Sequence, residues 1–366
     1  MNNSENTIEC LMKARAALNL HNVWFASTLS LSRNFSNFKF KDRLTSEQCH
    51  AIDQLVLDTC RQNPGTINNP VLIKTKDLTP WQKEIFLEHF LFNQGLSNPE
   101  MTAFIKDDSM SFCIALNVTD HVILHLIDFN QDLENNWSRL NQIDSAFHKQ
   151  VGFAFADDFG FLTTNPKYCG TGLSLGIFLH LPLLFELKKF NELIEEKNEL
   201  TYANFDGEIG NLLTEPLHFP GNIVMIRNSC SLGLTEENII SSIRIWCTKA
   251  MVAELGLRKT LLTEDNQLLK DKVMRALGLI THSYQLELSE ALNAFSLIKL
   301  GLEIGWLENK DNTSIITQAF WNIRRAYLMV NQSTPTNTPN PDEITKIRSK
   351  YLRDLCSKVI VKESAV

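Results

Sequence analysis

Apolar residues recur at strand spacing in several segments of the first half of the chain. One such segment covers residues 22–35, and residues 111–125 contain two apolar runs separated by polar positions. Residues 160–182 show an apolar lead-in, a turn with proline and glycine, and a second apolar run that ends at Pro182. We therefore predict strands in all three segments, and a helix that opens at Pro182.

Other segments carry apolar residues at helical spacing. Thr45 starts a Thr-Ser-Glu-Gln sequence that is typical of a capping box, and residues 78–92 show a second capped pattern. The pattern that opens at Pro182 continues to Leu193. A longer one starts at Thr235, with two acidic residues in its first turn, and closes near Gly256.

Helical patterns dominate the last third of the chain. Three patterns lie within residues 266–330, and a final helix is predicted over 342–359, after a loop rich in proline, asparagine, threonine and serine. Residues 255–265 are the predicted junction between the two parts of the chain. With 366 residues, two domains are also what the length favours.

Composition excludes several classes of protein. A net charge of −7 argues against general binding to nucleic acid or anionic membranes, and we find no apolar run of about 18 residues that could cross a bilayer. The eight cysteines are scattered, without a spacing typical of zinc ligands, so we predict no metal site. A polar start without a signal peptide indicates a cytoplasmic protein with reduced thiols.

The sequence Gly170-Thr171-Gly172 is the first candidate for chemistry. Flanking glycines permit positive φ and leave amide groups open, which is one way for a backbone to approach a phosphate closely. The sequence is neither a Walker A motif nor a dinucleotide fingerprint. A plain tight turn is the alternative interpretation.

The residues around this turn are more specific. The stretch GFLTTNPKYCGTGLSLGIFLHLP, residues 160–182, resembles the active-site loop of the ATP:guanidino phosphotransferases, G-Y-L-T-x-C-P-x-N-x-G-T-G-L-R-A-x-V-x-x-x-L-P. The helical C-terminal part is similar to the domain that distinguishes bacterial protein-arginine kinases of the McsB type. This resemblance implies an α+β fold: an antiparallel sheet flanked by helices over 18–256, and a helical bundle over 264–362.

The resemblance also shows which charges are missing. Active relatives carry arginine at five matching positions that hold the nucleotide phosphates, and this chain carries Thr28, Ser30, Ile123, Ser174 and Ala203 there. Of the two matching glutamates, the second, which orients the guanidinium and accepts a proton, is Thr119, and the reactive cysteine is Asn165. Glu208 matches the second carboxylate that binds guanidinium, with a surface turn as the alternative.

Some matching residues remain or replace what is lost. Arg33 matches a framework arginine, and His89 matches a histidine of the nucleotide pocket, although a structural histidine is the stronger alternative. Lys167 and Arg227 lie where they could furnish a reduced anion site together with Gly170, Thr171 and Gly172. Related kinases hold phosphoarginine on the helical domain, which suggests Arg348 and Arg353 here, with a solvated basic helix face as the alternative.

Three functional hypotheses follow. The first is a degenerate protein-arginine kinase homologue that acts by binding and needs no cofactor; its implied partners are a zinc-binding activator protein and Clp-type protease components. The second is an active kinase with a rebuilt site for Mg-ATP. The third is a non-enzymatic reader of phosphoarginine or another anion. Relatives commonly dimerise, so a homodimer is compatible with each hypothesis.

Overall fold

The computed structural model describes residues 23–63, 67–90, 98, 100–194, 200–203, 219–262, 266–309, 314–332 and 340–362. The helices of these parts are α2 (Ser46–Gln62), α3 (Pro80–Phe90), α4 (Leu133–Gln150), α5 (Pro182–Glu186), α6 (Glu236–Leu261), α7 (Gln267–His282), α8 (Leu288–Glu303), α9 (Ser314–Asn322), α10 (Arg325–Val330) and α11 (Pro341–Cys356). Short 3-10 turns include η4 (Pro166–Tyr168), between β7 and β8, and η5 (Phe190–Leu193), after α5.

The strands form one large sheet and two small pairs. The large sheet has the order β2-β3-β4-β5-β1-β8-β10-β9, and every pairing is antiparallel. This confirms the predicted α+β class with a helical C-terminal part. The strands are β1 (Trp24–Arg33), β2 (Val71–Lys74), β3 (Ala103–Lys106), β4 (Phe112–Leu116), β5 (Val122–Asp128), β6 (Phe155–Ala156), β7 (Gly160–Phe161), β8 (Leu173–His180), β9 (Leu200–Ala203), β10 (Ile223–Asn228), β11 (Leu307–Asn309) and β12 (Val359–Val361).

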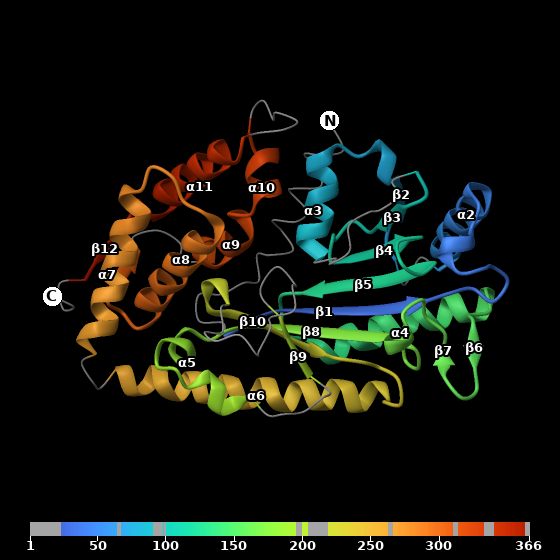
Figure 1. Ribbon diagram of the computed structural model, residues 1–366, viewed down its shortest axis with the longest axis horizontal. Helices are drawn as coiled ribbons and strands as arrows, with labels where there is room; N and C mark the ends of the chain where they lie inside the picture. Colours follow the sequence, from blue (N-terminus) through green and yellow to red (C-terminus); the bar gives the residue numbers. More distant parts are fainter. Residues whose placement is uncertain are drawn as a thin grey trace.

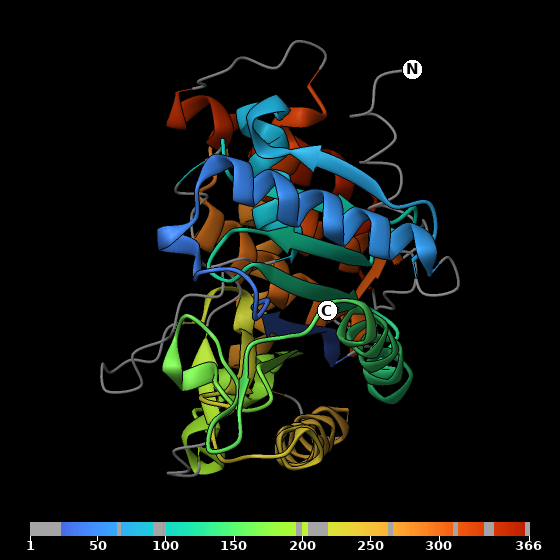
Figure 2. The same ribbon diagram turned by 90° about the vertical axis from the view of Figure 1, so that its right-hand side faces the viewer.

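Each face of the large sheet packs against a different set of helices. On the first face, Leu29 and Leu31 of β1 share a core with α2, α4 and α6. Figure 2 shows α4 and α6 nearly end-on on this side. On the second face, Phe25 and Phe178 share a core with α3 and the C-terminal helices, which Figure 1 shows grouped beside one end of the sheet. Because side chains alternate along a strand, the same strands contribute residues to both cores.

A buried ionic cluster joins the helical C-terminal part to the sheet part. Arg258 of α6 pairs with Glu254 at 3.1 Å and with Glu303 of α8 at 2.7 Å, and Lys299 contacts Glu303. Glu254 also accepts hydrogen bonds from two main-chain amides at the start of α5. Since burying charge is costly unless each group is paired, this cluster fixes how α6 and α8 meet.

Local signals placed most elements correctly. Thr45 forms the predicted capping box with Gln48, and the Thr235 hydroxyl accepts from the Asn238 amide at the start of α6. Three predictions were wrong in extent. The helix at Pro182 stops at Glu186, where Lys188 follows with a φ of 56°, and α6 continues past Gly256 to Leu261. The final helix ends at Cys356, because the chain then turns into β12.

Candidate functional site

The five positions that match phosphate-binding arginines include four on neighbouring strands of the second face. Ser30 lies opposite Ser174 of β8, and Thr28 lies opposite Gly176. Ile123 of β5 pairs with Ser32, two residues further along β1. Leu29 and Leu31, which point the other way, belong to the core of the first face. The strand register therefore places these positions in one patch on the second face. Arginines at all of them would give this patch a high positive charge.

The fifth position completes the patch at its far edge. Ala203 of β9 pairs with Met225 of β10, and Arg227 pairs with both Thr201 and Gly176. Thr28, Gly176 and Arg227 therefore lie in one row across β1, β8 and β10, and Arg227 is two strands away from Thr28. We call the residues Thr28, Ser30, Ser32, Ile123, Ser174, Thr201, Ala203 and Arg227 the hydroxyl face, after the side chains that dominate it.

The hydroxyl face is partly open and nearly uncharged. Ser30, Ser174 and Arg227 are half-buried, whereas Thr28 is only 7% exposed. Among the residues of β1, β5, β8, β9 and β10 that point to this side, Arg227 is the one arginine or lysine. A single cation on such a patch can pair with one anionic group.

His125 lies beside Ser30 and adds no positive charge. Their Nδ1 and Oγ atoms share a hydrogen bond of 2.5 Å across the β1 and β5 strands. Burial lowers the pKa of His125 to about 3, because the charged imidazolium would be removed from water. His125 is therefore neutral at physiological pH.

The glycines of the central loop are required by close packing of the backbone. Gly172 has a φ of 66°, and a Cβ there would lie 2.7 Å from the Ser32 carbonyl oxygen. Gly170 has a φ of 98°, and its Cβ would lie 2.8 Å from the Ser231 carbonyl oxygen. Thr171 between them is buried. The two glycines let the loop press against β1 and the segment after β10, which accounts for the motif without a bound phosphate.

Arg33 links the central loop around Gly170–Gly172 to α4, as expected for a framework residue. Its guanidinium makes two hydrogen bonds of 2.9 Å to the Asp144 carboxylate of α4. Its Nη1 donates to the Thr171 carbonyl at 2.8 Å, and its Cζ lies 3.9 Å from the centre of the Phe161 ring. Arg33 is 2% exposed, so it is committed to the scaffold.

Asp120 anchors the other side of the loop. Its carboxylate accepts from Asn34 Nδ2 at 2.6 Å and from the Thr164 amide at 2.7 Å. His121 next to it accepts from the Phe35 amide at 3.0 Å and contacts the Lys39 carbonyl at 2.7 Å. Burial lowers the pKa of His121, which keeps it neutral. These two residues of the matching motif act as structural supports.

Thr119 and Asn165 stand at two of the matching catalytic positions, and neither side chain titrates near neutral pH. Thr119 is half-buried, and its carbonyl accepts from the Thr164 hydroxyl at 2.8 Å. Asn165 is exposed and accepts from the Lys167 amide, so it caps the short η4 turn. Cys169 is buried beside Thr163, which fits the predicted role in packing. Lys167 is exposed on the same turn, and Glu208 lies outside the described residues.

Two further groups of predicted residues lie elsewhere. His89 is 1% exposed inside the second core, and its Nε2 lies 3.0 Å from the Met110 carbonyl oxygen, so it is a structural histidine. Arg348 is 4% exposed and donates to the carbonyls of Ile323 and Leu286 at 2.9 and 2.8 Å. Arg353 is exposed and donates to the Ser283 carbonyl. Both arginines bind the backbone of their own domain.

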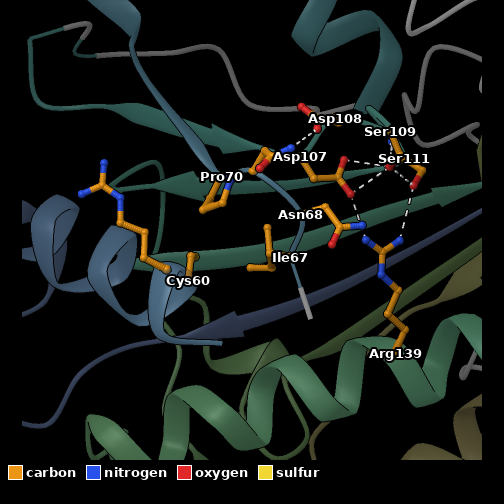
Figure 3. A pocket seen from close by; sticks show the side chains of 11 residues that line it. Cys60, Ile67, Asn68, Pro70, Asp107, Asp108, Ser109, Ser111 and Arg139 are labelled. Atoms are coloured by element: carbon orange, nitrogen blue, oxygen red, sulfur yellow. Dashed lines mark hydrogen bonds and ion pairs between the residues drawn. The ribbon is translucent and has the colours of Figure 1, made fainter. Parts of the chain in front are cut away.

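A polar hollow of about 860 Å³ lies apart from the hydroxyl face, between the end of α2, the turn after β3, and α4 (Figure 3). Arg139 reaches across it to Asp107 at 2.9 Å, and Ser109 donates to the same carboxylate. Asp107 is 2% exposed and fully engaged by these contacts. In the described parts of the chain, no group of three histidine, cysteine or acidic residues is arranged to hold a metal ion.

Comparison with known proteins identifies the class. The model of the ATP:guanido phosphotransferase C-terminal catalytic domain matches residues 52–254, and that of the protein-arginine kinase McsB C-terminal domain matches residues 266–365. The first match alone covers more than half of the chain. The chain therefore belongs to the ATP:guanidino phosphotransferase family, in the branch that carries the McsB-type C-terminal domain.

Individual relatives agree with this assignment. The chain is 41% identical to the protein-arginine kinase of Chlamydia pneumoniae, covering 95% of this chain and 96% of that one. It is 35% identical to the protein-arginine kinase of Chlamydia muridarum, over 92% and 93% of the two chains. The crystal structure of lombricine kinase matches with a TM-score of 0.53 and 17% identity, over 65% and 67% of the chains, which shows the shared fold.

Sequence reasoning missed two features of the site. It did not find the pairing of Ser30 with His125, which are 95 residues apart and meet only through strand register. It also did not foresee that Gly172 is needed by contact with Arg33 and Ser32. The alternation of serine with leucine in β1 was the available signal, since it placed the hydroxyls on one face.

In the described residues, no helix is both long and apolar enough to cross a membrane.

Proposed function

We propose that this protein is a catalytically degenerate member of the protein-arginine kinases that acts by binding protein partners. The observation that carries the proposal is the hydroxyl face: five positions that match arginine in active relatives lie together on the sheet and carry no cation. The partners we propose by family are a zinc-binding activator protein and Clp-type protease components, in the cytoplasm.

The missing charges argue against ordinary phosphoryl transfer. Each charge-assisted hydrogen bond to a phosphate contributes roughly 1.5–3 kcal/mol, and one arginine acting on the transferring group can supply roughly 10³–10⁵ in rate. Arg227 is a single cation at the edge of the hydroxyl face. One such residue cannot replace five, even when the individual contributions are far from additive.

The intact scaffold supports a role in binding. Arg33, Asp120 and His121 keep the central loop in place through buried hydrogen bonds that involve no nucleotide. The family's shape is thus held by residues that remain, while the residues that bind charge are replaced. A protein with this pattern can present the surfaces of a kinase without catalysing the reaction.

An active kinase is the alternative that one observation favours. Arg227 is half-buried on the hydroxyl face and Lys167 is exposed on the loop that borders it, so the two could hold an anion together. The hypothesis of a phosphoarginine reader gains less support, since Arg348 and Arg353 donate to carbonyls of their own domain.

A transfer assay tests the proposal. The full chain is incubated with γ-labelled Mg-ATP and an arginine-rich protein, and acid-labile phosphoarginine is measured. We expect no more labelled phosphoarginine than in a control reaction that lacks this chain. Label that disappears in Arg227→Ala, and persists in the matched control Arg61→Ala on the distant α2 helix, would support the active kinase instead.

A further inference from the structure

The polar hollow beside α4 shares no residue with the hydroxyl face. Its volume of about 860 Å³ falls within the roughly 300–1,000 Å³ typical of sites for small ligands. A second hollow of about 470 Å³ lies between the end of α2 and later turns of α4. Cys60 and Arg61 line the first hollow, and the next two residues, Gln62 and Asn63, line the second. The two hollows therefore adjoin at the end of α2.

Side-chain carboxamides are the common feature of the two hollows. The first is lined by Asn68 and Asn69, and the second by Gln62, Asn63, Asn141, Gln142 and Gln150. Asn68, Asn141 and Gln142 are exposed and form no hydrogen bond within the described residues. Because a carboxamide offers two donors and an acceptor, it suits ligand groups that both donate and accept, above all hydroxyl groups.

Arg139 supplies directed donors to the first hollow without adding net charge. Its Nη2 donates to the Asp107 carboxylate at 2.9 Å and its Nη1 to the Ser111 hydroxyl at 3.4 Å. Figure 3 shows these three side chains converging at one end of the hollow. A guanidinium has five N–H donors, so further donors remain for a ligand. Since Asp107 balances the charge of Arg139, a neutral oxygen is the acceptor that this end suits.

The remaining charges around the hollows also balance one another. Arg61 pairs with Asp58 at 3.7 Å. One acid, Asp108, is then left at the first hollow, and one cation, Lys149, at the second. A ligand of either sign therefore meets no excess of opposite charge, whereas an uncharged ligand needs none.

We propose that the two hollows form one binding site for a short, neutral oligosaccharide. Its hydroxyl groups bond to the carboxamides and to Arg139. Its C–H face packs on Cys60 and Ile67, which are each 1% exposed, and on Pro70. From Arg139 to Lys149, α4 runs about 15 Å at 1.5 Å per residue, which leaves room for more than one sugar ring.

The binding is expected to be weak but measurable. None of the residues that line the two hollows is aromatic, so a sugar ring has no aromatic ring to stack on. Each hydrogen bond to the ligand also replaces one to water, so its net contribution is small. We therefore expect dissociation constants of about 0.1–10 mM.

Saturation-transfer NMR of the full chain with maltotriose and cellotriose tests the proposal, because this method detects millimolar binding. Asn68→Ala and Asn141→Ala each remove an exposed carboxamide from one hollow, and each should weaken the better-bound trisaccharide about threefold to tenfold. Gln54→Ala is the matched control: it removes an exposed carboxamide of α2 that lines neither hollow, and it should leave binding unchanged. Circular dichroism should show the same melting for all four proteins.

Two further probes test the class of ligand. Citrate is an anion, and triglycine presents peptide main chain. If either binds in a way that depends on Asn68 while neither trisaccharide binds, the hollows recognise charge or main chain, and the proposal is overturned. No saturable binding of either trisaccharide up to about 20 mM would overturn it too, as would binding that Asn68→Ala or Asn141→Ala leaves unchanged, or that Gln54→Ala weakens equally. Because the hydroxyl face contributes no residue to this site, the result is independent of nucleotide binding there.

Discussion

Ser30 and Ser174 lie directly opposite each other on β1 and β8, at two positions that the family resemblance matches to phosphate-binding arginines. Two hydroxyls in this register are compatible with an empty site. Two arginines would repel each other unless an anion lay between them, because cross-strand neighbours on one face have Cβ atoms about 4.5–5.5 Å apart.

The first prediction concerns this pair. The double variant Ser30→Arg and Ser174→Arg should melt at a lower temperature than the natural protein, because like charges oppose each other and His125 loses its partner. Adding tripolyphosphate should raise the melting temperature of the double variant and leave the natural protein unchanged. Differential scanning fluorimetry measures both. An equal response of the two proteins would show that the hydroxyl face is not where phosphates would bind.

The second prediction concerns the support beneath the loop. Arg33→Ala leaves the Asp144 carboxylate without its two hydrogen bonds and should lower the free energy of unfolding by about 3–5 kcal/mol. Arg61→Ala breaks an exposed ion pair with Asp58 and should cost less than about 1 kcal/mol. Urea titrations of both variants provide the comparison. A similar decrease in the free energy of unfolding for both variants would contradict the role of Arg33 in stabilising the loop.

The third prediction separates local from global stability. Asp120→Ala removes the acceptor for the Thr164 amide and for Asn34, so the loop should open more often than the sheet. Hydrogen exchange at Thr164 should accelerate more than exchange in β8. Asp108→Ala, which removes an exposed contact with Asn69, serves as the control. Uniform acceleration across both elements would contradict a local role for Asp120.

The fourth prediction is a dependence on pH. The pKa of His125 is lowered to about 3 by burial, whereas an unfolded histidine titrates near pH 6.5. The unfolded state therefore binds an extra proton below pH 6.5, so stability is complete above that pH and falls as the pH drops toward 3. His125→Gln should make the decline between pH 6.5 and 4 less steep in urea titrations. An unchanged slope would show that His125 does not cause it.

Local and periodic signals were sufficient to place most of the elements, and the family resemblance supplied their arrangement in the fold. The capping box at Thr45 and the alternation in β1 each describe a few neighbouring residues, and the structure confirms them. The end of the helix that begins at Pro182 was not predictable from the sequence. Apolar residues continue at helical spacing beyond Glu186, but the backbone leaves the helical conformation at Lys188, which has a positive φ. The periodicity of a sequence does not report where the backbone turns.

The site was harder to predict because it depends on tertiary contacts. Family resemblance identified Thr28, Ser30 and Ser174 as positions without their arginines, but only strand register shows that they share one face. Conversely, His89 and Arg348 were candidates for ligand binding, and burial against carbonyl groups explains both instead. The sequence does not show whether a charged or titratable side chain already has its hydrogen-bond partners within the folded protein.

The most direct test of the account is calorimetric titration of the full chain with Mg-ATP and Mg-ADP at low ionic strength, where weak electrostatic binding is least screened. We expect no saturable heat at millimolar nucleotide, because the hydroxyl face offers a single cation. Saturable binding that is lost in Arg227→Ala would contradict the central claim, since it would show that the phosphates have found a working site on this face.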